Sequence, residues 1–134
     1  MPTLPADPPI WITADEIEAI NQEILSGTSE PFHVLNRGSL ESAAARPLNA
    51  WAYEGEDDRI VLAVRLLEGI GQNHCFQQGN KRTAFFAALE FIERNGGEYA
   101  VNDGEDLGRL CEAVILRQAA PMELVALLRR RVRF

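Results

Sequence analysis

Residues 59–70 read Arg-Ile-Val-Leu-Ala-Val-Arg-Leu-Leu-Glu-Gly-Ile, and residues 84–92 read Ala-Phe-Phe-Ala-Ala-Leu-Glu-Phe-Ile. Both segments are apolar on nearly every side, and a helix of that kind is buried on every side. We therefore expect these two segments to be the central helices of one bundle.

The segments on either side of this pair are also helical in pattern. A capping box at Thr13-Ala14-Asp15-Glu16 predicts a helix start, and Gly27 predicts its end. The other expected elements are a loop over 28–40, an alanine-rich helix over 40–45 that stops at Pro47, a short helix over 48–53, and amphipathic helices over 104–118 and 121–131. No run alternates strictly between apolar and polar residues, so the pattern predicts an all-α protein.

The length of 134 residues fits one domain. Residues 1–10 contain four prolines and are expected to form an extended leader, with a single domain over 11–134. No apolar stretch is long enough to span a membrane. The first residues lack the pattern of a secretory signal, and the two cysteines cannot form a disulfide framework. We expect a reduced, cytoplasmic protein with no membrane partner.

The charge argues against a nucleic-acid partner. The whole chain carries a formal charge of −7, and residues 1–128, with 20 acidic and nine basic residues, carry −11. A body this acidic does not favour binding to a phosphate backbone. We expect the arginines after residue 128 to be solvated or to interact with a helix dipole.

The loop between the two central helices carries the polar chemistry. Gly79 allows a tight turn at the helix start, where the first N–H groups have no partner within the helix. Asn80, Lys81 and Arg82 add an amide, the only lysine of the chain and a guanidinium. Together these groups predict an anion site for phosphate. The alternative is that both cations are solvated, but cations in a first turn oppose the helix dipole.

His74 lies six residues before Asn80 and is the expected general base, because histidine changes its charge near neutral pH. We expect Phe76 to be a core residue that holds the loop in place, and Cys75 to serve packing. We expect the second histidine, His33, to be structural.

The run His74-Cys75-Phe76-Gln77-Gln78-Gly79-Asn80-Lys81-Arg82-Thr83 resembles the motif of the Fic/Doc (Fido) family, His-x-Phe-x-Asp/Glu-Gly/Ala-Asn-Lys/Gly-Arg. Ala84–Gly96, Gly38–Ala43 and Arg46-Pro47 are also similar to Doc sequences, so the resemblance covers the chain from Trp11 onward. It implies a Fic/Doc-type bundle of about six to seven helices. A short flap, with a β-hairpin at Val34-Leu35 as one option, is expected before the third helix.

Two positions resemble the Doc toxins of toxin–antitoxin systems. Fic adenylyltransferases usually have Gly at the position of Lys81 and a second Arg at the position of Phe85, whereas Doc toxins have Lys and an apolar residue. The resemblance implies transfer of the γ-phosphoryl group of ATP, with Mg²⁺, to a Ser/Thr hydroxyl of a target protein. In this reading His74 is the base, and Gly79, Asn80, Lys81 and Arg82 bind phosphate.

The resemblance also implies partners. In Doc toxins the target is translation elongation factor Tu, and an antitoxin of the Phd type inhibits the toxin. The flap residues Phe32, His33, Val34 and Leu35 are expected to register the target chain by strand addition.

One departure from the motif concerns the metal. Gln78 stands where the family has the acid that helps to hold Mg²⁺, and Mg²⁺ prefers carboxylate oxygens. The alternatives are therefore a weakened nucleotide- or protein-binding module, and an AMP-transferring Fic enzyme. The inhibitory motif of many Fic proteins matches only partly at Ser26–Glu30, and Pro31 prevents a helix from continuing, so we do not expect self-inhibition by that route.

Overall fold

Six α-helices and one pair of two-residue strands make up the regular structure of the part of the chain that the computed structural model describes, residues 7–100 and 104–134. In chain order they are α1 (Ala14–Ser26), α2 (Arg37–Glu54), α3 (Arg59–Gln72), α4 (Asn80–Arg94), β1 (Glu98–Tyr99), α5 (Glu105–Ile115), α6 (Pro121–Arg131) and β2 (Val132–Arg133). The predicted all-α helical bundle is confirmed.

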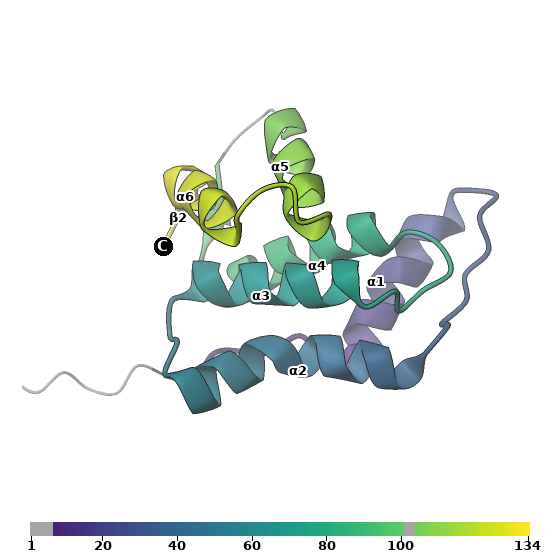
Figure 1. Cartoon of the computed structure of the whole chain (residues 1–134), viewed down its shortest axis with the longest axis horizontal. Helices are drawn as coiled ribbons and strands as arrows, with labels where there is room; N and C mark the ends of the chain where they lie inside the picture. Colours follow the sequence, from purple (N-terminus) through teal and green to yellow (C-terminus); the bar gives the residue numbers. More distant parts are fainter. Residues whose placement is uncertain (1–6, 101–103) are drawn as a thin grey trace, which may run out of the picture.

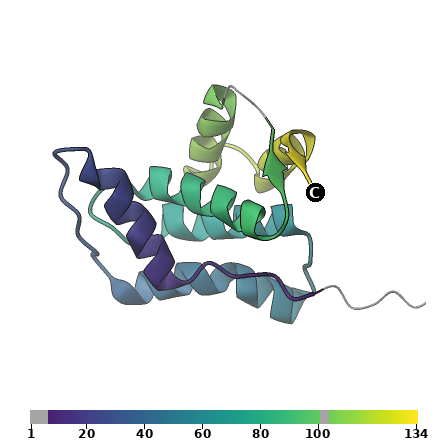
Figure 2. The same ribbon diagram turned by 180° about the vertical axis from the view of Figure 1, so that it is seen from behind.

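The central position of α3 and α4 is also confirmed. They lie side by side, with α2 along one side of the pair and α5 and α6 on the other, while α1 crosses the end where α3 leads into α4 (Figure 1, Figure 2). Helix α3 is buried almost all round, as its sequence predicts. Its buried residues are Ile60, Leu62, Ala63, Val64, Leu66, Leu67, Glu68, Gly69, Ile70 and Gly71.

Helix α1 begins as predicted. The Thr13 hydroxyl accepts a hydrogen bond from the N–H of Glu16 at 3.2 Å, and the Glu16 carboxylate accepts one from the N–H of Thr13 at 3.0 Å. These two bonds form the expected capping box. Gly27 is the C-cap, which confirms the predicted end of the helix.

Helix α2 corrects the expectation of two short helices separated at Pro47. It runs through the proline as one helix of 18 residues. Leu40, Ala43, Pro47 and Ala50 are its buried residues, at a spacing that puts them on one face against α3. Gly69 of α3 allows close contact there, because a Cβ atom at Gly69 would lie 3.2 Å from the backbone of Ala43. This packing holds the helix together where proline removes a backbone hydrogen bond.

The flap also differs from expectation. It lies between α1 and α2, one helix earlier than expected, and α2 already begins at Arg37 because Asn36 caps it, with its Oδ1 atom accepting from the N–H of Ser39 at 3.0 Å. Within the described residues the flap forms no hairpin. Instead Val34 makes a single antiparallel bridge with Phe76. The flap therefore pairs with the loop before α4 rather than with itself.

The ends of the described chain are held by α4 and by the strand pair. Asn95, the C-cap of α4, accepts from the N–H of Ile10 at 2.8 Å and donates to its carbonyl at 3.0 Å. Strands β1 and β2 pair antiparallel, which the sequence did not predict. Residues 1–6 of the expected leader lie outside the described residues.

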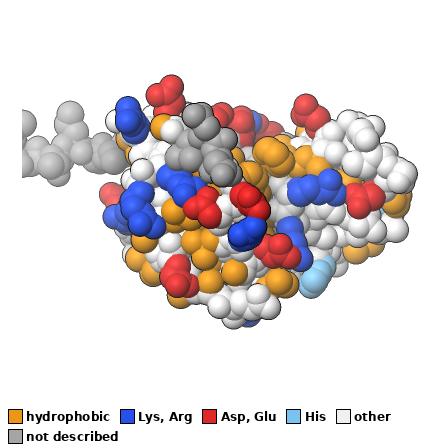
Figure 3. Space-filling view, turned by 90° about the horizontal axis from the view of Figure 1, so that it is seen from above, with side chains coloured by type: hydrophobic (Ala, Val, Ile, Leu, Met, Phe, Trp, Pro, Cys, Tyr) orange, Lys and Arg blue, Asp and Glu red, His pale blue; other side chains and the backbone are white. Residues whose placement is uncertain are grey.

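The face formed by α5 and α6 carries acidic and basic side chains among apolar ones (Figure 3). None of the described helices is both long enough and apolar enough to cross a membrane.

Candidate active site

The loop from Asn73 to Gly79 joins the two central helices and presents His74. Helix α3 ends at the C-cap Asn73, and His74 follows with a φ of 50°, in the left-handed region. The next two residues, Cys75 and Phe76, are buried, with exposed fractions of 0% and 1%. Because the loop is anchored by these neighbours, the exposed imidazole is held at the surface of the bundle end.

The flap holds this loop from outside. The N–H of Leu35 donates to the carbonyl of Cys75, and the N–H of Gln77 donates to the carbonyl of His33, both at 2.9 Å. Phe32, His33 and Leu35 are exposed, and Val34 packs partly against the core. The side chain of His33 is exposed, and its structural role in holding the loop is played by its backbone carbonyl.

Asn80 closes the loop from the helix side. Its Oδ1 atom accepts from the N–H of Phe76 at 3.0 Å, and its Nδ2 atom donates to the carbonyl of Phe76 at 2.7 Å. Two of the side chain's hydrogen-bonding groups are therefore used to fix the loop, and one N–H of the amide is left for a ligand.

Gly79 is the N-cap of α4 and adopts a φ of 79°. It supplies no side-chain cap, and the first turn of α4 contains no acidic residue, so this helix start is open to an anion. Asn21 of α1 supports the turn from below. Its Nδ2 atom donates to the carbonyl of Gln78 and to the hydroxyl of Thr83, both at 2.9 Å.

Asn21 was not among the predicted site residues, although its position on α1 carries a signal. Its position lies four residues after Ile17 and four before Leu25, the other buried residues of α1. A fully buried amide on an apolar stripe usually has hydrogen-bond partners. Here the partners are the two residues that flank the start of α4.

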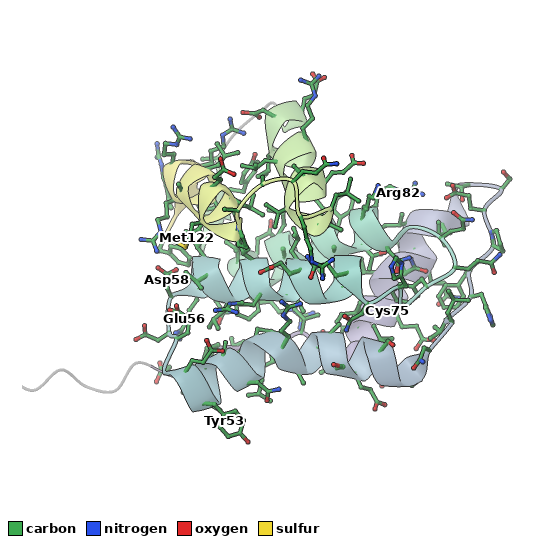
Figure 4. The ribbon with its side chains drawn as sticks, in the orientation of Figure 1. Tyr53, Glu56, Asp58, Cys75, Arg82 and Met122 are labelled. Atoms are coloured by element: carbon green, nitrogen blue, oxygen red, sulfur yellow. The ribbon has the colours of Figure 1, made fainter. Side chains whose placement is uncertain are left out.

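The two cations of the motif are each paired with a carboxylate from another part of the chain. The Nζ atom of Lys81 lies 2.9 Å from Glu112 of α5, and a guanidinium nitrogen of Arg82 lies 2.6 Å from Glu30 in the turn after α1. Arg82 projects outward from the first turn of α4, whereas Cys75 lies inward near the end of α3 (Figure 4). Burial raises the pKa of the Cys75 thiol to about 11, which agrees with a packing role.

A pocket of about 620 Å³ brings these groups together. It contains most of the sequence-predicted site, with α5 and its C-terminal turn forming the opposite wall. Its lining residues include His74, Gln77, Gln78, Gly79, Asn80, Lys81, Arg82, Glu112, Ile115, Leu116 and Arg117. The volume is in the range of small-molecule sites. The residues of α5 and of the turn after it were missed, because nothing local in their sequence shows that they face the motif.

The structure does not provide a ready metal site. Gln78 lines the pocket with the neutral amide that the sequence analysis noted, and Glu112, the acid in the same lining, is paired with Lys81. Across the described residues there is no group of three His, Cys, Asp or Glu side chains that could hold a metal ion.

Comparison with known proteins supports the resemblance. The model of the Fic/DOC family matches residues 11–92. The chain is 37% identical to Toxin Doc of Mycolicibacterium smegmatis over 97 residues, which cover 64% of this chain and 73% of that protein. It is 30% identical to Protein kinase doc of Escherichia phage P1 over 106 residues, 79% of this chain and 78% of that protein. These matches agree with the geometry of the motif loop, Asn73 to Gly79, and of the start of α4. The chain belongs to the Fic/Doc family.

Proposed function

We propose that this Fic/Doc protein is a Doc-like toxin that transfers the γ-phosphoryl group of a nucleoside triphosphate to a Ser or Thr hydroxyl of a target protein. The observation that carries the proposal is that His74 lines the same pocket as Gly79, Asn80, Lys81 and Arg82. A base is thereby placed beside an open helix start that favours phosphate. The relative from phage P1, which is named a protein kinase, supports the same reading.

The proposed reaction is a direct displacement at phosphorus. The hydroxyl proton of the target passes to an imidazole nitrogen of His74, and the hydroxyl oxygen bonds to the γ-phosphorus. The bond from that phosphorus to the bridging oxygen of the β-phosphate breaks, and the nucleoside diphosphate leaves with the electron pair. The N–H groups at the start of α4 stabilise charge on the phosphate oxygens.

Lys81 and Arg82 would stabilise the same charge after an exchange of partners. Each is now paired with a carboxylate, and each of the four side chains is about half exposed. Exposed ion pairs of this kind are weak, at about 0–1 kcal/mol. A triphosphate can therefore replace Glu112 and Glu30 as the partner of these cations.

The family resemblance implies Mg²⁺, but the residues present do not fit a metal held by the protein. Gln78 offers a neutral amide oxygen, and the described residues form no cluster of metal-binding side chains. Mg²⁺ commonly keeps several waters and binds through phosphates.

The same observation favours a second candidate, a binding module of the Fic/Doc fold with weak or no turnover. A site that has lost its acid can still bind a nucleotide through the helix start. An AMP-transferring enzyme is less favoured, because Phe85 packs partly against the core where adenylyltransferases have a second arginine.

The target and the inhibitor belong to the same proposal. Elongation factor Tu is the proposed target, and the flap is its proposed docking edge. The Val34–Phe76 bridge rests on two bonds from its flanking residues, in which the carbonyl of His33 accepts and the N–H of Leu35 donates. The N–H and carbonyl of Val34 itself face the other way and form no backbone hydrogen bond with any described residue. An extended target segment could pair there.

We propose inhibition in trans by an antitoxin of the Phd type, which agrees with the naming of one relative as a toxin. Co-expression with the neighbouring gene should suppress growth arrest by this protein. Arrest that persists under co-expression would contradict a neighbouring antitoxin.

The test of transfer uses ATP labelled at either the γ- or the α-phosphate, Mg²⁺ and purified elongation factor Tu. Phosphoryl transfer predicts that only the γ-label appears on the factor, and that His74→Ala abolishes it. Appearance of the α-label would instead identify AMP transfer. If the wild type binds ATP without any transfer and Gln78→Glu restores transfer, the protein is the binding module.

A further inference from the structure

Two non-glycine residues in the described ranges, 7–100 and 104–134, have a positive φ: His74 at 50° and Arg117 at 60°. For residues with a Cβ atom this conformation is strained. Both residues line the same pocket. Strained residues of this kind cluster at active sites, where the surrounding structure holds them in place. The proposed reaction uses His74 but gives Arg117 no role.

Arg117 occupies a backbone position that usually belongs to glycine. At the end of α5, the N–H of Arg117 donates to the carbonyl of Val114 at 3.1 Å, and the N–H of Gln118 donates to the carbonyl of Ala113 at 2.8 Å. These two bonds form a Schellman motif, in which the left-handed residue is most often glycine. The backbone conformation alone favours glycine here, so what an arginine contributes at this position comes from its side chain.

The side chain of Arg117 is not used to cap its own helix. A guanidinium nitrogen donates to the Oε1 atom of Gln72 at 3.2 Å, while the Nε2 atom of Gln72 donates to the carbonyl of Ile115 at 3.3 Å. The carbonyl of Ile115 in the last turn of α5 is thus bonded by Gln72 and not by Arg117. A cation that only complemented the helix dipole would be expected to bond those carbonyls itself.

Arg117 also differs from the other cations of the pocket in its charge partner. Lys81 is paired with Glu112, and Arg82 with Glu30. Arg117 has a neutral amide as its partner and forms no ion pair with any described residue. Of the Lys and Arg side chains in the lining, it alone can accept an anion without giving up a carboxylate.

We propose that Arg117 is an anion-binding residue of this pocket that contacts the phosphate chain of the nucleotide. This inference rests on the proposed function, because it assumes that a nucleoside triphosphate binds at the start of α4. The phosphate chain then lies between two walls, the helix start on one side and the guanidinium from the end of α5 on the other. A planar guanidinium binds two phosphate oxygens at once and holds the chain in one orientation.

The variant Arg117→Gly separates this role from a structural one. Glycine suits a φ of 60°, so the substitution should leave the melting temperature unchanged or higher. The same substitution should weaken the binding of both ATP with Mg²⁺ and inorganic tripolyphosphate by about tenfold or more, as loss of a charged hydrogen bond does. Both affinities would be measured by isothermal titration calorimetry.

Arg130→Gln is the matched control. Arg130 is exposed on α6 and lies outside the pocket lining, so its substitution removes the same charge from a position away from the site. It should change both affinities by less than about twofold. Arg117→Lys keeps the positive charge but loses the planar guanidinium that binds two oxygens at once. Its affinities for ATP and tripolyphosphate should lie between those of the wild type and of Arg117→Gly.

The outcomes separate the inference from the proposed function. If the wild type binds ATP and Arg117→Gly binds both ligands equally well, the inference is wrong and the proposed function stands. If the variant loses affinity for ATP but not for tripolyphosphate, Arg117 does not contact phosphate and the inference is also wrong. If the wild type binds no nucleotide, the proposed function fails and the inference fails with it.

Discussion

The carboxylate of Glu30 lies 2.6 Å from the guanidinium of Arg82, so an acid from the turn after α1 neutralises a cation at the start of α4. Helix α1 ends at Ser26 with Gly27 as its C-cap, as predicted, and Glu30 reaches Arg82 from the turn that follows instead of from a helix. The Glu30 carboxylate therefore stands where we expect a phosphate oxygen to bind.

Removing this carboxylate charge should strengthen nucleotide binding. Glu30→Gln leaves Arg82 without a charged partner, so a triphosphate no longer has to displace one. Exposed ion pairs contribute about 0.2–1 kcal/mol, which corresponds to a rise in ATP affinity of up to about fivefold. Glu23→Gln, on the exposed face of α1, is the control and should have no effect. Unchanged or weaker binding by Glu30→Gln would show that Arg82 does not exchange Glu30 for phosphate.

Gly79→Ala should destabilise the protein. The residue has a φ of 79°, and a Cβ atom there would lie 3.1 Å from the Nδ2 atom of Asn21. The backbone conformation alone costs about 1–2 kcal/mol, a fall of about 3–8 °C in melting temperature. Gly27→Ala is the control, because its φ is −93° and nothing lies within 4 Å of the added methyl group. Equal melting temperatures for the two variants would contradict the strained turn.

Asn21→Ala should weaken the junction between the loop and α4. It removes the bond to the part-buried carbonyl of Gln78 and the bond to the buried hydroxyl of Thr83, and a buried group that loses its partner costs about 1–3 kcal/mol. Chemical denaturation measures this loss. Gln22→Ala, one residue further along α1 and exposed, should change the free energy of unfolding by less than about 0.5 kcal/mol. A similar loss in both variants would mean that Asn21 contributes only helix propensity.

The stability of α1 should depend on pH through Glu16. Its hydrogen bonds to Arg94 and Thr13 lower the pKa of the carboxyl from 4.5 to about 2. A carboxyl whose pKa is lower in the folded state stabilises the fold above pH 4.5, and that contribution is lost as the pH falls toward 2. Glu16→Gln should therefore unfold at a lower denaturant concentration than the wild type at pH 7, and the difference should shrink as the pH falls through this window. Glu23→Gln should unfold at the same denaturant concentration as the wild type at each pH. If the difference between Glu16→Gln and the wild type stays constant at all pH values, the pKa of Glu16 is not lowered by folding.

Local patterns were sufficient to predict the central pair of helices and the capping box at Thr13 and Glu16. These features depend on residues that are neighbours in sequence, so a local sequence pattern is enough to predict them. The break predicted at Pro47 was wrong because the effect of proline on a helix is local, whereas the contact of Ala43 with Gly69 that supports α2 comes from another helix.

The candidate site was predictable only as far as the motif extends. His74 and Arg82 lie in one short segment and line one pocket in the structure. Asn21, Glu30 and Arg117 belong to the same site but come from α1, from the turn after it and from the end of α5. These residues come together only because their elements pack against α4, and the spacing of residues in the sequence does not predict that packing.

The most direct test of the account is a crystal structure with a non-hydrolysable ATP analogue and Mg²⁺. We expect the phosphate chain to lie at the N–H groups that begin α4, with the γ-phosphorus closer to the imidazole of His74 than the α- or β-phosphorus. A nucleotide bound elsewhere on the protein, or one with its α-phosphorus nearest to His74, would contradict phosphoryl transfer by this site.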